Sequence, residues 1–177
     1  MKPINEKDIA TWITKAGKTE RIAEFQYPYL DGFYVDIAYA SRFQLNQIRQ
    51  LAAEPYTDRR TRDEKERYNE DKLNLGYAER IVKGWRGLTV GTLDGLIPGS
   101  FDQAKAQIEE DSKKKSEAKA LSDDDIRDME VMYSVETTVA ILSSSVDFVN
   151  WIVDTAGDAK RYSSMAAKKK EEYENLK

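Results

Sequence analysis

The chain has 177 residues, of which 40% are hydrophobic and 34% charged, and its formal net charge is -4. This length suits one domain with a modest core and solvated extensions, and basic and acidic residues are too evenly mixed for a large nucleic-acid-binding face. Cysteine and histidine are absent, which excludes disulfides, thiol and Ser-His catalysis, and the usual zinc sites.

The N-terminal residues are polar, and no apolar run approaches the roughly 20 residues needed to cross a bilayer. We therefore expect a soluble intracellular protein without a signal peptide or a membrane contact. Within residues 5–16, Ile9, Trp12 and Ile13 recur at helical spacing, and Gly17 follows where a helix would end. This spacing predicts a short first helix.

Apolar residues alternate with period two over residues 21–27 and 33–39, and Pro28 and Asp31-Gly32 lie between the two runs. The pattern predicts a β-hairpin with a longer loop. Aromatic side chains crowd this hairpin, namely Tyr27, Tyr29, Phe33, Tyr34 and Tyr39. Without neighbouring lysines and arginines, they favour a core or an interface over the stacking of bases.

Ser41 and Gln44 form a capping-box pattern, and helical spacing of apolar residues then continues towards Pro55. This predicts a helix that packs on the hairpin. Residues 56–72 carry six basic and six acidic side chains, which predicts a solvated loop or an exposed helical start. A second core helix is predicted over residues 73–85.

Residues 84–99 form a mostly apolar stretch that contains five glycines, namely Gly84, Gly87, Gly91, Gly95 and Gly99. Neither a P-loop nor a dinucleotide motif is present, so we interpret them as helix termination and tight turns rather than a phosphate cradle. Ser100 and Gln103 start another capping-box pattern. Residues 103–121 are then rich in charge and poor in large apolar groups, and we treat them as a charged insertion.

Ser122 with Asp125, and Ser144 with Asp147, repeat the helix-start pattern before two apolar faces that are expected to close the core. These faces are Ile126, Met129, Met132, Tyr133 and Val139, and then Phe148, Trp151, Ile152 and Ala156. The acidic run at residues 123–128 offers oxygen ligands. It lacks the spacing of a calcium loop and suits the first turn of a helix, so no metal site is predicted.

Together these patterns predict an α+β, mostly helical protein, in which an N-terminal β-hairpin packs with a bundle of helices. A single domain is expected over residues 1–160, and residues 161–177 are expected to form a charged helical or disordered tail. No arrangement of carboxylates, serines, tyrosines or lysines indicates an active site, so we expect a protein that is not an enzyme and needs no cofactor.

Two elements of the sequence point further. The stretch LGYAERIVKGWRGL matches a V-x-G-W-x-G-[LV] pattern after a helix, and SSSVDFVNWIVDTAGDAKRY matches a late helix of the type F-x-x-W-[IVL]. The matching residues are Ile81, Val82, Gly84, Trp85, Gly87 and Leu88, and then Phe148, Trp151, Ile152, Ala156 and Asp158. In this order the chain resembles the tail assembly chaperones of long-tailed bacteriophages over roughly residues 20–162.

The resemblance implies a chaperone that binds the tape measure protein, keeps it soluble and helps recruit tail tube subunits. It further implies that the protein acts in the host cell cytoplasm and is absent from the mature virion. Members of this family are often also made in a longer form, by ribosomal frameshifting, that contacts the tube protein, and whether this chain has such a form is left open. Self-association is left open.

A tape measure protein is long and largely helical, so its apolar stripe would dock in a groove with aromatic and methionine anchors. The candidate partner-binding residues are Trp85, Leu93, Leu96, Ile97, Met129, Met132, Phe148 and Trp151. Each is also a candidate for the core, because a domain of this size needs such side chains there.

Two alternative functions stay open. The first is a structural tail or tail-completion protein, whose hairpins would pair edge to edge in rings. The second is a small nucleic-acid-binding phage regulator that uses the aromatic hairpin together with Arg59, Arg60 and Arg62.

Overall fold

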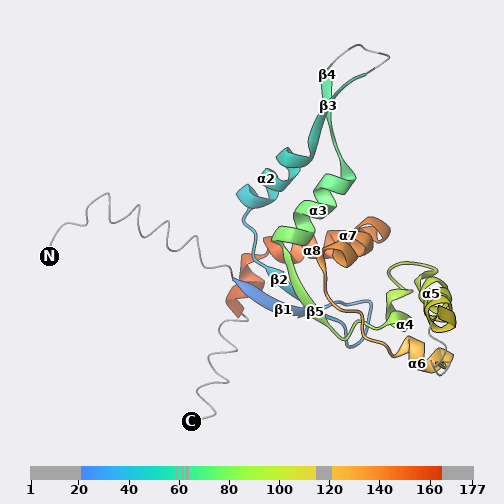
Figure 1. Cartoon of the computed structure of the whole chain (residues 1–177). Helices are drawn as coiled ribbons and strands as arrows, with labels where there is room; N and C mark the ends of the chain where they lie inside the picture. The colour runs from blue at the N-terminus through green and yellow to red at the C-terminus, as the bar shows by residue number, and fades with distance from the viewer. Residues whose placement is uncertain (1–20, 59, 61, 63, 115–120, 165–177) are drawn as a thin grey trace, which may run out of the picture.

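The computed structural model describes residues 21–58, 60, 62, 64–114 and 121–164 (Figure 1). The expected helix at residues 5–16 and residues 165–177 of the expected tail lie outside this part of the chain. The elements in chain order are β1 (Ile22–Gln26), β2 (Tyr34–Ala38), α2 (Arg42–Ala52), β3 (Ala53–Thr57), β4 (Glu64–Tyr68), α3 (Glu70–Arg80), β5 (Val82–Arg86), α4 (Val90–Leu93), α5 (Ser100–Lys114), α6 (Asp123–Arg127), α7 (Val135–Ser144) and α8 (Val146–Gly157). The predicted α+β class is confirmed.

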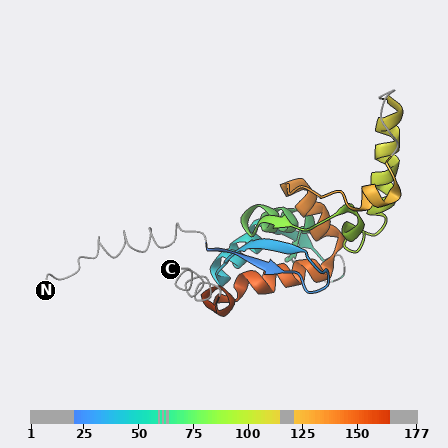
Figure 2. The ribbon, with the colours of Figure 1, turned by 90° about the horizontal axis from the view of Figure 1, so that it is seen from below.

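A three-stranded antiparallel sheet, in the order β1-β2-β5, forms the base of the molecule (Figures 1 and 2). The predicted hairpin is confirmed as β1 and β2, which pair from Ile22 opposite Ala38 to Gln26 opposite Tyr34. Val35 lies opposite Phe25 on one side and Trp85 of β5 on the other. Since side chains alternate along a strand, these apolar residues share the face that the helices cover.

The opposite face of the sheet is polar. Arg86 of β5 donates two hydrogen bonds to the carboxylate of Glu24, at 2.6 and 2.9 Å, and its guanidinium lies 4.1 Å from the centre of the Tyr34 ring. Apolar and polar residues alternate along these strands because one face of the sheet packs against helices and the other face is solvated.

Helices α3 and α8 contact the sheet, on β5 and β2, and helices α2 and α7 pack against them. The largest fully buried side chains include Phe33, Ile37, Ile81, Ile141, Phe148 and Ile152. They come from the hairpin, from the end of α3 and from the last two helices, so the core joins the two halves of the sequence.

The helix predicted over residues 73–85 is shorter at its C-terminal end than expected. Helix α3 ends at Arg80, and the chain continues as the edge strand β5, whose Val82 and Trp85 pair with β2. The β-branched Ile81 and Val82, followed by Gly84, fit a pleated strand better than a helix. Residues 82–86 form a strand because they pair with β2. The spacing of apolar residues within this segment gives no sign of a pairing with a distant strand.

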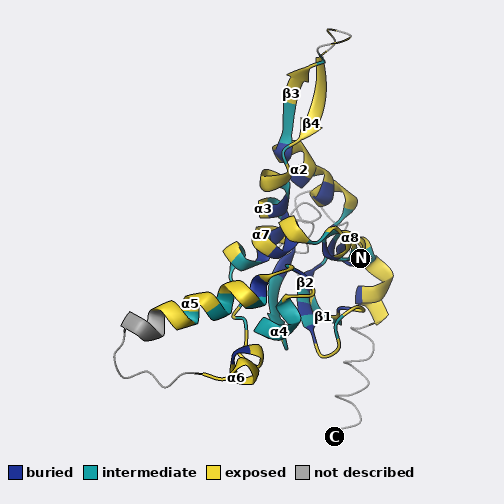
Figure 3. Cartoon of the chain, turned by 90° about the vertical axis from the view of Figure 1, so that its right-hand side faces the viewer, coloured by how far each residue is buried: buried dark blue, intermediate teal, exposed yellow. Residues whose placement is uncertain are grey.

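The expectation of a solvated loop or an exposed helical start over residues 56–72 is wrong at residues 56–57 and 64–68, which form strands, whereas the exposed start of α3 at Glu70 agrees with it. Strands β3 and β4 form a two-stranded antiparallel arm that projects from the ends of α2 and α3 (Figure 3). Its base is closed by a hydrogen bond from Asn69 N to Ala52 O at 2.8 Å. All of β4 is exposed, so its apolar and polar residues do not alternate. The charged sequence therefore gives no signal that predicts a strand.

Helices α4, α5 and α6 form a second cluster beside the sheet. Helix α5 begins at Ser100, and Arg127 of α6 lies 4.8 Å from the centre of the Phe101 ring. Beyond α8, residues 159–164 are helical. Within them, the hydroxyl of the buried Tyr162 donates to Ile37 O at 3.0 Å, so the packed structure extends to this residue.

Candidate functional site

The structure sorts the eight candidate partner-binding residues by exposure. Leu96 and Phe148 are buried, at 3% and 0%. Four others are partly buried and pack against the core, namely Trp85, Leu93, Ile97 and Trp151. Met129 and Met132 are exposed, at 42% and 78%. The candidate contact surface is therefore the methionine segment, which we define as residues 129–132.

The methionine segment is extended, although the sequence predicts that its two methionines lie on a helix. Helix α6 ends at Arg127, and the segment then runs antiparallel to residues 88–90. Val90 N donates to Met129 O at 2.9 Å, and Val131 N donates to Leu88 O at 2.8 Å. These two bonds hold the backbone of an otherwise irregular stretch in one conformation.

A hydrogen bond from Trp85 links the methionine segment to the sheet. Its indole Nε1 donates to Val131 O at 2.7 Å, and its ring meets that of Tyr133 edge-on, with 5.0 Å between the centroids. The Tyr133 hydroxyl in turn donates to Val82 O at 2.8 Å. Burial raises the pKa of Tyr133, so its hydroxyl keeps the proton that it donates.

The two glycines beside Trp85 have structural reasons. A Cβ on Gly84 would lie 3.0 Å from the carboxylate oxygen of Asp36 on the neighbouring strand. Gly87 has φ +75°, and a Cβ there would lie 2.0 Å from the carbonyl oxygen of Gly32. Gly87 thus forms the tight turn that the sequence predicts, whereas Gly84 lies within β5, where it allows close pairing with β2 instead of ending a helix.

The two sequence elements that carry the family resemblance meet in the core through Phe33. The Phe33 ring centroid lies 6.5 Å from that of Trp85 and 6.0 Å from that of Phe148. On the far side of Phe148, Trp151 lies 5.0 Å from Tyr27. Burial, and secondarily the charge of Asp147, raises the pKa of Tyr27. Trp85 and Trp151 thus belong to one aromatic cluster.

Sequence reasoning missed Val131 and Tyr133 as the residues that position the methionine segment. Tyr133 was assigned to a helical face, whereas its role depends on a hydrogen bond to β5, 51 positions earlier in the chain. The sequence offers one signal that residues 131–133 are extended, and it lies in their residue types. Val131 and Tyr133 are of residue types that are enriched in strands.

The acidic run of α6 has structural partners. Asp123 forms an ion pair with Lys105 at 2.7 Å, and Asp125 accepts hydrogen bonds from Ser122, which lower the pKa of this carboxyl. Across the described ranges, no group of three acidic side chains is placed to hold a metal ion. Among the helices seen there, none has the length and apolar character to cross a membrane.

The aromatic hairpin and the arginines of the nucleic-acid hypothesis lie apart. Tyr27 and Phe33 are buried in the core, and Tyr34 is covered by Arg86. Arg60 and Arg62 are exposed at the tip of the β3–β4 arm, at the other end of the molecule from the sheet (Figure 1). This geometry does not bring stacking and basic groups together.

Comparison with known proteins finds no matching family model, no matching curated protein and no matching solved structure.

Replacing Trp85 with phenylalanine is expected to loosen the methionine segment. A smaller aromatic ring replaces the indole in both this variant and its control, but here Val131 O also loses its donor, which costs about 1–2 kcal/mol. Hydrogen exchange of the Val131 and Val90 amides should accelerate. Trp151→Phe is the matched control, because its indole has no hydrogen bond to any residue that the structure describes. Equal acceleration in both variants would show that the bond to Val131 does not hold the segment.

Proposed function

We propose that the protein is a phage tail assembly chaperone. It binds the tape measure protein, keeps it soluble and helps recruit tail tube subunits in the host cell cytoplasm. The observation that carries the proposal is the position of the exposed Met129 and Met132, on a segment that is hydrogen-bonded to Trp85 of the family-like element.

The chemistry of this surface suits a helical partner. Methionine side chains are unbranched and flexible, so they adapt to successive apolar residues along a helix. The backbone beneath them is fixed by the bonds to Leu88 and Val90, which lowers the entropy cost of binding. Partly buried Leu93 and Ile97 belong to the neighbouring α4 region, and we assign them a supporting role.

The proposal predicts that Met129→Glu/Met132→Glu abolishes the chaperone effect. Co-expression with a tape measure protein should raise the soluble fraction of that partner. The double variant should bind it about tenfold more weakly or worse, a loss of at least about 1.4 kcal/mol. Both side chains are exposed, so stability should change by no more than about 0.5 kcal/mol.

Val146→Glu is the matched control, because Val146 is 74% exposed at the start of α8, outside the methionine segment. It should leave the effect on solubility intact. If the unaltered chain does not raise the solubility of the tape measure protein, the proposed function is wrong. Recovery of the protein in purified particles would instead support the structural tail protein.

A further inference from the structure

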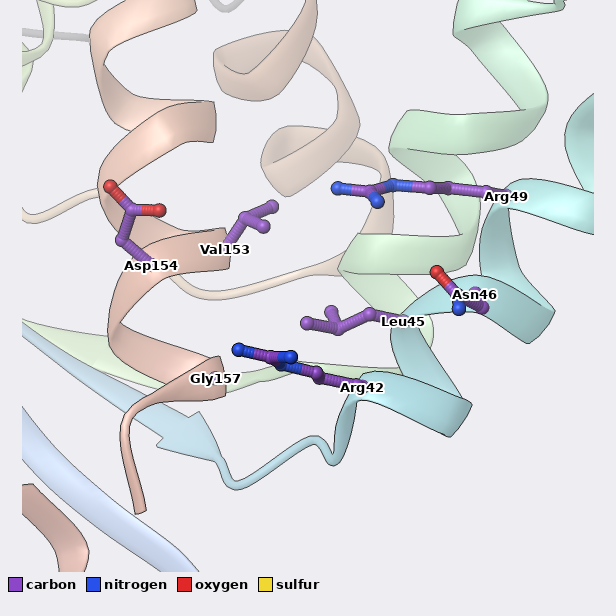
Figure 4. Close-up of a pocket in the computed structure, with 7 residues that line it drawn as sticks. All are labelled: Arg42, Leu45, Asn46, Arg49, Val153, Asp154 and Gly157. Carbon is purple, nitrogen blue, oxygen red and sulfur yellow. The ribbon is translucent and has the colours of Figure 1, made fainter. Parts of the chain in front are cut away.

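A shallow groove lies between α2 and α8, which run antiparallel, so that Gly157 lies beside Arg42 and Val153 beside Arg49 (Figure 4). We call it the α2–α8 groove. Leu45 and Val153 point into it from opposite sides and form its apolar floor. Gly157 continues this floor without a side chain, since a Cβ there would lie 3.6 Å from Leu45 Cδ1.

Two arginines flank the apolar floor. Both extend from α2 towards α8, with Arg49 above Leu45 and Arg42 below it in the view of Figure 4. Across the residues that the structure describes, neither guanidinium has an ion pair or a hydrogen bond. Asp154 also borders the groove, but its carboxylate points away from both guanidinium groups. The groove therefore presents two positive charges that its own residues do not pair.

The stability of α2 explains one of these arginines but not the other. Arg49 lies in the last turn of α2, where the helix dipole favours a cation. Arg42 is the first residue of α2, where the dipole disfavours a cation, and this first turn has no acidic side chain. The C-terminal end of α8 beside Arg42 offsets part of that cost. A carboxylate from outside the chain would stabilise both guanidinium groups.

The spacing of the two charges matches that of side chains on a second helix. Arg42 and Arg49 are seven residues apart, roughly 10 Å or two turns along α2. Carboxylates seven residues apart on another helix have the same spacing and share one face, and a residue three positions after the first lies between them. Leu45 has this middle position on α2, so an apolar side chain of the second helix would meet it there.

We propose that the α2–α8 groove binds an acidic amphipathic helix of a partner protein. Two carboxylates of that helix, seven residues apart, form charge-assisted hydrogen bonds with Arg42 and Arg49. The apolar side chain between them packs on Leu45 and Val153. The groove has a volume of about 380 Å³, which suits the side chains of one helix face. It shares no residue with the methionine segment, so the inference does not depend on the proposed function.

Two synthetic peptides test the charge argument by fluorescence anisotropy. Both are alanine-based helices with one leucine. The acidic peptide has glutamates three residues before and four residues after the leucine, and the basic peptide has lysines at the same two positions. We expect the acidic peptide to bind at least about tenfold more tightly than the basic one. In Arg42→Glu/Arg49→Glu this preference should reverse, because the groove then presents two carboxylates.

Arg60→Glu/Arg62→Glu is the matched control, because it changes the net charge of the chain equally at the exposed tip of the β3–β4 arm. It should keep the preference for the acidic peptide, which separates a contact in the groove from long-range attraction. NMR of the unaltered protein locates the contact. The acidic peptide should shift the amide signals of Leu45, Asn46 and Val153, and it should leave those of the methionine segment in place.

Three outcomes overturn the proposal. In the first, the acidic peptide does not bind at concentrations up to about 1 mM, the weak end of measurable affinity. In the second, it binds, but the groove amides do not shift or the double reversal at Arg42 and Arg49 leaves the preference unchanged. In the third, the groove amides shift with protein concentration before any peptide is added, which assigns the groove to a second copy of the chain.

Discussion

Phe148→Ala is expected to destabilise the protein by roughly 3–5 kcal/mol, the usual cost of removing a fully buried phenylalanine. Phe148 is 0% exposed, and its ring lies 5.2 Å from Tyr27, 6.0 Å from Phe33 and 5.9 Å from Trp151, measured between centroids. The cavity would open where the hairpin meets α8. Because whole domains are stable by only about 5–15 kcal/mol, urea unfolding should show a large drop in the midpoint.

Val146→Ala on the same helix is the control, since Val146 is 74% exposed. Its free energy of unfolding should change by less than about 0.5 kcal/mol. A change of under about 1 kcal/mol for Phe148→Ala would contradict the assignment of Phe148 to the core. A loss of partner binding in this variant would report damaged folding, so it is no test of the methionine segment.

Local signals in the sequence predicted the parts of the fold whose structure is decided locally. The capping boxes at Ser41 and Ser122 form as expected, with reciprocal hydrogen bonds to Gln44 and Asp125. The alternation in residues 21–39 appears as the β1–β2 hairpin, because one face of these strands packs and the other is solvated. In each case a few neighbouring residues carry enough information.

The parts that the sequence did not predict depend on pairing between distant segments. Val82–Arg86 becomes a strand because it pairs with β2, nearly 50 positions earlier. The β3–β4 arm pairs the strongly charged β4 with β3, which carries one charged residue, and neither strand has a buried side chain. Apolar periodicity, the main signal for a strand, is therefore missing there.

The candidate site was only partly predictable, because its geometry also depends on contacts between distant segments. The sequence singled out Met129 and Met132 as apolar residues, but an expected helix gave them the wrong backbone. It singled out Trp85 as a contact residue, whereas the indole N–H bonds to Val131 and the ring packs against Tyr133. Residue type indicated the importance of these positions, and only the hydrogen bonds between distant segments distinguish the anchor from the exposed surface.

Gly87→Ala is expected to destabilise the protein by roughly 3 kcal/mol or more, in part because a left-handed backbone at a residue with a side chain costs about 1–3 kcal/mol. The remainder comes from contact. The new Cβ would lie 2.0 Å from Gly32 O, and a backbone oxygen in a hairpin turn cannot move aside as a flexible side chain can. Either the turn before Phe33 or the exit from β5 must shift.

Gly99→Ala separates these two causes, because Gly99 has φ +82° and its Cβ would meet nothing within 4 Å. It should therefore lose only the conformational part, about 1–2 kcal/mol, in the same thermal or urea unfolding measurement. Gly87 also precedes Leu88, whose carbonyl accepts the Val131 N–H. Hydrogen exchange of the Val131 amide should therefore be faster in Gly87→Ala, and it should be unchanged in Gly99→Ala. Equal costs for the two variants would mean that the approach of Gly32 to Gly87 is not as close as the fold requires, and the Gly-Trp-x-Gly pattern would then need another explanation.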